Sequence, residues 1–182
     1  AAAASCAVEP WSTRGGDPTR RGDVASAAKP IYTHFLLKAC EDGKVQSVDD
    51  PVLPLQPQLG ELNPDLGHKD TAITWRHLAS QTSCYGVAEA PGAAFCYNDW
   101  QMALFWDLLF LKVYGTTPER VDAEVLRPLL TDLLQCEDAP TLLAFGTKDR
   151  AGRLAISPRD FARFGLLYLR RGAWRGQQLL SP

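Results

Sequence analysis

The most informative stretch of the chain is SAAKPIYTHFLLKAC, residues 26–40. Its apolar residues recur every four positions, at Ile31, Phe35 and Ala39. This spacing is typical of one face of a helix. Gly43 follows shortly afterwards and can adopt the left-handed conformation that ends a helix. The stretch therefore predicts a helix that begins near Ser26 and buries one face.

A serine and a lysine stand at the start of this predicted helix, in the pattern Ser26-Ala27-Ala28-Lys29. Residues three apart lie on the same helix face, so the hydroxyl and the ammonium can meet. A serine is a poor nucleophile until a base removes its proton, and a lysine serves as a base only if its pKa falls below ~10.4. The positive end of the helix dipole disfavours the ammonium and favours an oxyanion. The pattern alone has two interpretations, a nucleophile with its base or a helix-capping serine before a solvated lysine.

Composition excludes several classes of protein. The chain has 182 residues, of which 46% are hydrophobic and 22% charged, so it is globular and long enough for its own core. It carries 19 basic and 21 acidic residues, a net charge of −2. We therefore expect no nucleic-acid partner and no binding to an anionic membrane surface. The longest apolar run, residues 102–113, is too short to span a bilayer.

The cysteines and histidines show no metal-binding spacing. The five cysteines stand at positions 6, 40, 84, 96 and 136, without a Cys-x-x-Cys pair. The histidines are His34, His68 and His77, and none belongs to a His-Glu-x-x-His motif. We expect neither a metal nor a cofactor, and we expect most cysteines to be buried as small apolar residues.

The rest of the chain reads as helices joined by loops. Residues 1–22 are expected to form an arm or loop, and the prolines of residues 51–70 are expected to exclude regular structure there. Further helices are predicted at 75–78 behind a Thr74 cap, at 100–114, from Thr117-Pro118 to 126, at 128–134, and from Ser157-Pro158 to 171. The apolar helix at 100–114 should lie in the centre of the protein. Few strands are expected.

Several of these segments, in this order, resemble the serine β-lactamase and penicillin-binding-protein superfamily, in particular its class-C-like hydrolases and esterases. The matching segments are 26–29, 41–44 with 48–52, 73–78 with 81–83, 91–99 and 156–165. Tyr97-Asn98-Asp99 stands where that superfamily has its Tyr-x-Asn motif. The resemblance implies an α+β, β-lactamase/transpeptidase-like fold. Residues 23–182 would form mostly its helical domain, with the nucleophile helix and little of the sheet.

The resemblance also implies roles for four residues. Ser26 would be the nucleophile that forms an acyl-enzyme, and Lys29 would take its proton or hold the hydrogen-bond network. Tyr97 would be the second base and later the acid that protonates the leaving group. A tyrosine with a pKa near ~10 needs a cationic neighbour such as Lys29 for this. Asp99 replaces the usual asparagine and would either hold Lys29 as an ammonium or cap the helix that begins at Trp100.

The third motif of the superfamily, a Lys-Thr-Gly or His-x-Gly strand, has no counterpart in suitable context. Gly146-Thr147-Lys148 is only its reversal. In that superfamily the motif supplies one of two backbone donors to the oxyanion, the other being the amide of the nucleophile. We therefore expect a truncated chain, whose sheet a second chain or a missing segment would complete.

Three functions remain open. The first is a serine hydrolase that forms an acyl-enzyme with an ester, amide or β-lactam carbonyl of a small-molecule or peptide substrate. The second is a truncated, non-catalytic homologue that binds a ligand, and the third is an unrelated helical interaction module. The compartment is undetermined, although the resemblance favours a periplasmic or secreted protein.

Overall fold

The computed structural model describes residues 16–144 and 151–182 of the chain. Its α-helices are α1 (Lys29–Glu41), α2 (Trp75–Ala79), α3 (Asp99–Trp106) and α4 (Pro158–Leu169). Short 3-10 helices are η1 (Ala25–Ala28), η2 (Leu53–Leu55), η3 (Pro57–Glu61), η4 (Pro64–Leu66) and η5 (Lys69–Ala72), and π-helices are η6 (Asp107–Val113) and η7 (Asp122–Thr131). The strands are β1 (Gly22–Asp23), β2 (Thr141–Ala144), β3 (Ala151–Ile156), β4 (Ala173–Trp174) and β5 (Gln177–Gln178).

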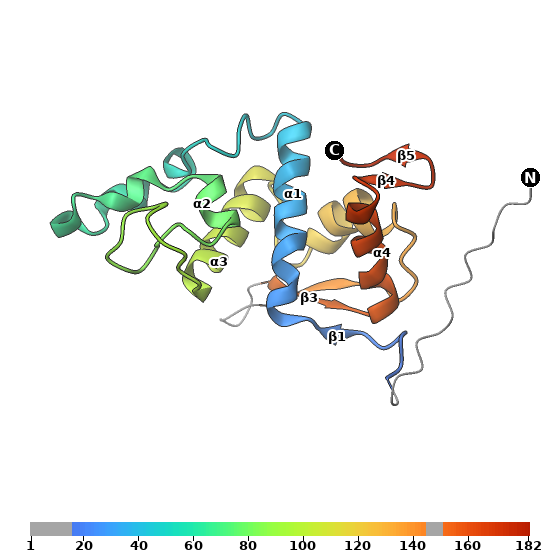
Figure 1. Ribbon diagram of the computed structural model, residues 1–182. Helices are drawn as coiled ribbons and strands as arrows, with labels where there is room; N and C mark the ends of the chain where they lie inside the picture. Colours follow the sequence, from blue (N-terminus) through green and yellow to red (C-terminus); the bar gives the residue numbers. More distant parts are fainter. Residues whose placement is uncertain (1–15, 145–150) are drawn as a thin grey trace, which may run out of the picture.

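Helix α1 stands in the middle of the molecule, as Figure 1 shows. The short helices of residues 53–79 and α3 lie on one side of it, and the strands β1–β3 with α4 lie on the other. The molecule is therefore α+β and mostly helical, as predicted. How the chain divides into an N-terminal arm and a helical domain stays a prediction, and residues 1–15 of that arm lie outside the described residues.

Helix α1 forms as its sequence predicts. Ile31, Phe35 and Ala39 have no exposed surface, which confirms the buried face. The helix ends at Glu41, and Gly43 follows with a φ of +69°. The next amide, that of Lys44, donates 2.8 Å back to the carbonyl of Ala39, so the glycine reverses the chain at the end of the helix.

The second long helix packs against α1. Helices α3 and η6 are continuous and bury Met102, Leu104, Phe105, Trp106, Leu108, Leu109 and Phe110. Edge-on aromatic contacts join the two helices, with ring centroids 6.5 Å apart for Tyr32 and Phe105 and 5.6 Å apart for Phe35 and Phe110. The prediction that this apolar helix lies in the core is confirmed, although Trp100 at its start is exposed.

Two predictions about secondary structure need correction, and both concern segments that contain proline. Residues 51–70 were expected to lack regular structure but contain the four 3-10 turns η2 to η5, three of which have proline in their first two positions. Proline's fixed φ suits the start of such a turn. The helices expected at 117–126 and 128–134 are instead the single π-helix η7, with Pro128 inside it. There the amide of Asp132 donates to the carbonyl of Arg127, five residues back.

A small antiparallel sheet, which the sequence did not predict, supports the N-terminal end of α1. Its order is β1-β3-β2, with Gly22 opposite Ile156 and Thr141 opposite Ala155. Residue 22, expected in the arm, is thus part of a strand. Gly146-Thr147-Lys148 lies outside the described residues.

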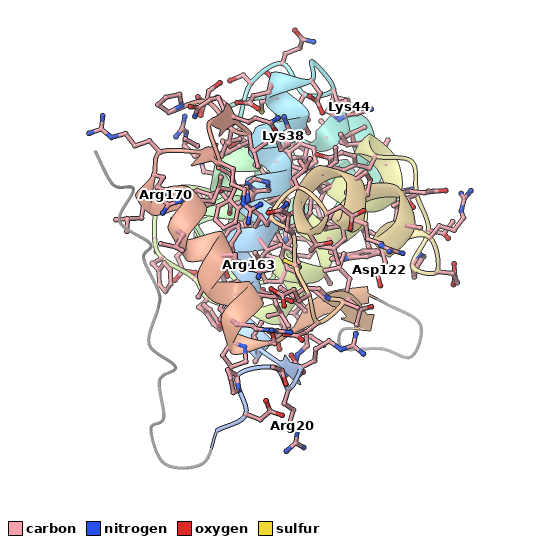
Figure 2. The ribbon with its side chains drawn as sticks, turned by 90° about the vertical axis from the view of Figure 1, so that its right-hand side faces the viewer. Arg20, Lys38, Lys44, Asp122, Arg163 and Arg170 are labelled. Atoms are coloured by element: carbon pink, nitrogen blue, oxygen red, sulfur yellow. The ribbon has the colours of Figure 1, made fainter. Side chains whose placement is uncertain are left out.

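Helix α4 follows the sheet and lies beside α1 and η7, as the turned view in Figure 2 shows. The Ser157 side chain caps it by accepting from the amide of Asp160, as predicted. The carboxylate of buried Asp160 accepts the amides of Glu137 and Asp138, and Arg163, labelled in Figure 2, lies 3.3 Å from that carboxylate. These bonds tie α4 to the segment that connects η7 and β2. In the described part of the chain, no helix is long and apolar enough to span a bilayer.

Candidate active site

Ser26 lies where the chain passes from β1 into α1. It belongs to η1, which leads directly into α1. The residue before it, Ala25, has a φ of +47°, a conformation that non-glycine residues rarely adopt. The carboxylate of Asp23 accepts the Ala25 amide at 2.7 Å and also pairs with Arg153 of β3 at 2.6 Å. The backbone just before Ser26 is therefore strained, and Asp23 ties it to the sheet through Arg153.

The structure brings Ser26, Lys29 and Tyr97 together. The Ser26 and Tyr97 hydroxyls form a hydrogen bond although the two residues are 71 positions apart in the sequence. The Lys29 ammonium donates 2.7 Å to the same Tyr97 oxygen and lies 4.4 Å from the centre of the Tyr97 ring. The phenol oxygen thus bridges a hydroxyl and a cation. The catalytic roles of these residues stay predictions.

A network of buried amides holds the Tyr97 segment in place. The side chain of Asn98 caps α3 by accepting from the amide of Gln101 and donates 3.1 Å to the carbonyl of Tyr85. Fully buried Gln101 accepts from Ser83 at 2.7 Å, and its amide group donates to Gln81 and to the carbonyl of Cys96, the residue before Tyr97. This network was not predicted, although a glutamine in a helix predicted to lie in the core is a signal for it.

The charges around Tyr97 act on its phenol. The hydrogen bond from Lys29, and then that from Ser26, lower the pKa of Tyr97 below its usual value, and the negative charge of Asp99 opposes them. The phenol is 51% exposed, so solvent screens these interactions. A lowered pKa favours the phenolate, which is the form of Tyr97 that can accept a proton.

Asp99 does not cap α3, and its effect on the charge of Lys29 stays a prediction. The helix cap is Asn98, so Asp99 is the first residue of α3. Its carboxylate forms no ion pair with Lys29, although both residues lie within the described chain. Asn98 is the cap because its extended backbone, with a φ of −152° and a ψ of 160°, aims the side chain at the first turn of α3. Asp99 instead lines the pocket beside Ser26.

This pocket has a volume of about 150 Å³. Its side chains come from η1 and α1 on one side, and from α3 and β3 on the others. They include Ser26, Lys29, Tyr32, Asp99, Met102 and Arg153. Arg153 was missed by sequence analysis because its strand was not predicted. The charged groups of Lys29, Asp99 and Arg153 make the pocket polar.

The three histidines lie apart from the pocket and take structural positions. His34 is buried in α1, where its Nδ1 lies 3.2 Å from the Tyr168 hydroxyl. His77 accepts the Thr74 amide at 3.2 Å and completes the predicted cap of α2. His68 is an exposed turn residue with a φ of +53°. Within residues 16–144 and 151–182, no group of three or more His, Cys, Asp or Glu side chains could hold a metal ion.

Comparisons with solved structures identify the fold. Similar structures include a penicillin-binding protein from Bacillus halodurans and β-lactamases from Sulfitobacter sp. and Mycobacterium bovis. Their TM-scores are 0.66, 0.63 and 0.60, they are 16%, 15% and 22% identical to this chain, and the matches cover 91%, 92% and 86% of it. The chain therefore has the fold of β-lactamases and penicillin-binding proteins, mostly its helical part, which confirms the predicted fold.

The matches span only part of the similar proteins. This chain corresponds to 63%, 54% and 50% of the lengths of those three chains. No protein-family model and no curated protein sequence matches it. The fold is thus known from structure, and activity has to be argued from the site.

Proposed function

We propose that this chain carries the nucleophile and the base of a serine hydrolase that works through an acyl-enzyme. The observation that carries the proposal is the hydrogen-bonded row Ser26–Tyr97–Lys29, in which the Tyr97 oxygen accepts 2.7 Å from Lys29. A hydroxyl bonded to a base, with a third group orienting that base, is the arrangement of an activated nucleophile. The helical fold shared with β-lactamases and penicillin-binding proteins supports the same function.

In this proposal the Ser26 hydroxyl attacks the substrate carbonyl and gives its proton to the Tyr97 phenolate. The hydrogen bond from the Lys29 ammonium favours the ionised form of the phenol. The amide of Ser26, near the start of the helix, is the donor for the oxyanion, since the first amides of a helix have no partner within it. Tyr97 then passes the proton to the leaving group as the carbonyl carbon–leaving group bond breaks. Finally water, deprotonated by Tyr97, releases the acyl group from Ser26.

The carbonyl could belong to an ester, an amide or a β-lactam. Because the chain spans 50% to 63% of the three similar proteins, the activity and substrate of a whole protein are also part of the proposal. The choice among these carbonyls rests on how fast each acyl-enzyme forms and how fast it is hydrolysed.

Intact-protein mass spectrometry with benzylpenicillin tests the proposal. The chain and a Ser26→Ala variant are incubated with penicillin, and the mass is followed over time beside the hydrolysis of a phenyl ester. We expect an adduct or ester hydrolysis with the wild-type chain and neither with the variant. An adduct that persists indicates a penicillin-binding protein, and one that is lost rapidly indicates a β-lactamase. A folded wild-type chain that shows neither would favour the non-catalytic alternative.

A further inference from the structure

Exposed aromatic side chains gather on the segment that carries Tyr97. Phe95 is 71% exposed and Trp100 is 65% exposed. Tyr97 itself is also exposed, and the remaining large exposed apolar residues of the described chain lie in η4, just after η7 and in α4, at Leu66, Leu133, Tyr168 and Leu169. Exposed apolar surface that concentrates beside a polar pocket is typical of a binding site.

Each of these two rings lies against one neighbour. The Phe95 ring lies beside that of Tyr97, with centroids 6.4 Å apart and planes inclined by 34°. The Trp100 indole lies over Gly86, where an added Cβ would come within 2.8 Å of the ring carbon Cε3. Gly86 also has a φ of +85°, so the loop admits the indole only because this residue is glycine. Aromatic side chains have few torsions to fix, so they lose little conformational entropy when a ligand binds.

We infer that Phe95 and Trp100 form a subsite for the leaving group of the substrate, and that this leaving group is apolar and preferably aromatic. The inference rests on the proposed function. Since Tyr97 returns the proton to the leaving group, the leaving atom must come within hydrogen-bond distance of the Tyr97 oxygen. The group attached to that atom then lies next to the Phe95 ring, which is Tyr97's aromatic neighbour.

The charge distribution assigns the two halves of the substrate. The charged residues that line the pocket at Ser26 are Lys29, Asp99 and Arg153, so the pocket suits a small or polar acyl group. The Phe95 ring lies beside Tyr97 outside the lining of that pocket and carries no charge. An acetyl ester of an aromatic alcohol fits both sides. Its acetyl group is transferred to the Ser26 oxygen, its carbonyl carbon–oxygen bond breaks, and the alcohol leaves with the proton from Tyr97.

The test compares benzyl acetate with ethyl acetate, because the two share the acetyl group and release alcohols of similar acidity. Hydrolysis of each ester is measured from the rate of proton release at constant pH. The full chain is compared with Phe95→Ala, Trp100→Ala and the control Leu169→Ala. Leu169 is a matched control, since it is 79% exposed and lies at the far end of α4. We expect kcat/KM of the wild-type chain to favour benzyl acetate by about tenfold, the rate equivalent of one aromatic ring pair. The ratio of kcat/KM for benzyl acetate to that for ethyl acetate should fall toward one in both aromatic variants and stay unchanged in the control.

Other results would overturn the inference in distinguishable ways. Equal kcat/KM values of the wild-type chain for the two esters would refute the subsite and leave the hydrolase proposal intact. A preference that survives in Phe95→Ala and Trp100→Ala would also refute it. A changed oligomeric state with an unchanged preference would show that the rings pack against protein. If the folded wild-type chain hydrolyses neither ester, the proposed function fails, and the inference fails with it.

Discussion

The ammonium of Lys29 donates a 2.7 Å hydrogen bond to the phenol oxygen of Tyr97 and lies 4.4 Å from the centre of the same ring. The two residues come from different elements, 68 positions apart. Lys29 begins α1, while Tyr97 lies in the loop before α3. The cation therefore acts on both the oxygen and the ring face of one side chain. Because the same oxygen bonds to Ser26, any change at Lys29 also reaches the serine.

Replacing Lys29 with methionine should raise the pKa of Tyr97. The Lys29 hydrogen bond is the largest cause that lowers this pKa, so its removal leaves the phenol protonated to higher pH. Less phenolate near neutral pH means slower removal of the Ser26 proton. Absorbance titration of tyrosinate should show one midpoint move to higher pH, and the rise in Ser26 labelling rate with pH should move in the same direction. An unchanged pH profile would show that Lys29 does not control Tyr97.

Replacing Gln101 with leucine should weaken the fold and misplace Tyr97. The variant fills the same core space but leaves the Ser83 hydroxyl, the Gln81 amide and the Cys96 carbonyl without their partner. Each buried polar group left without a partner costs about 1–3 kcal/mol. Because three such groups are affected, chemical denaturation should show a loss of about 3 kcal/mol or more. Labelling of Ser26 should slow under conditions where the variant is folded. Rapid labelling of the folded variant would exclude a positioning role for Gln101.

Replacing Ala25 with glycine should stabilise the chain. Ala25 has a φ of +47°, and the left-handed conformation costs a residue with a Cβ about 1–2 kcal/mol. Glycine removes most of this cost, and thermal unfolding should move to higher temperature. The same freedom loosens the backbone before Ser26, so labelling should become slower even though stability increases. A variant that is less stable than the wild type would show that Ala25 stores no strain.

The buried imidazole of His34 should make stability depend on pH in the acid range. Burial, and then the charge of Lys38, lower the pKa of His34 from 6.5 to about 4. Between these values the unfolded chain binds a proton that the folded chain does not, so the free energy of unfolding rises with pH up to about 6.5 and is then constant. The full difference is on the order of 3 kcal/mol.

Denaturation curves between pH 4 and 7 test this dependence. The His34→Gln variant should lose most of the slope whatever its absolute stability. The exposed His68→Gln variant serves as the matched control and should retain the slope. An equal slope in the wild type and in His34→Gln would assign the pH dependence to other groups.

Much of the helical part of the fold could be predicted because its signals are local. The four-residue spacing of Ile31, Phe35 and Ala39 and the caps at Thr74 and Ser157 depend only on neighbouring residues. The approach of Ser26 to Tyr97 was predicted from a family resemblance, since nothing local in the sequence connects residues 71 positions apart.

The unpredicted features depend on distant contacts. Arg153 reaches Asp23 across 130 residues, and only the pairing of β1 with β3 puts them together. Capping of α3 was one of the two roles expected for Asp99, but the backbone geometry assigns it to Asn98. Pro128 was read as a helix boundary, but the wider turn of a π-helix accommodates it. In each case the outcome depends on backbone geometry or tertiary pairing that residue type alone does not encode.

Fluorophosphonate labelling shows whether Ser26 is an activated nucleophile and whether Tyr97 is its base. We label the wild-type chain and the variants Ser26→Ala, Tyr97→Phe and Tyr114→Phe and measure their intact masses over time. Tyr114→Phe is the control, because the Tyr114 hydroxyl donates to the Phe35 carbonyl. We predict one adduct on the wild type and on Tyr114→Phe, and none on Ser26→Ala. Labelling of Tyr97→Phe should be slower by about 10²–10⁴, the usual contribution of a general base. A wild-type chain that stays unlabelled while folded, or an adduct that remains in Ser26→Ala, would contradict the account.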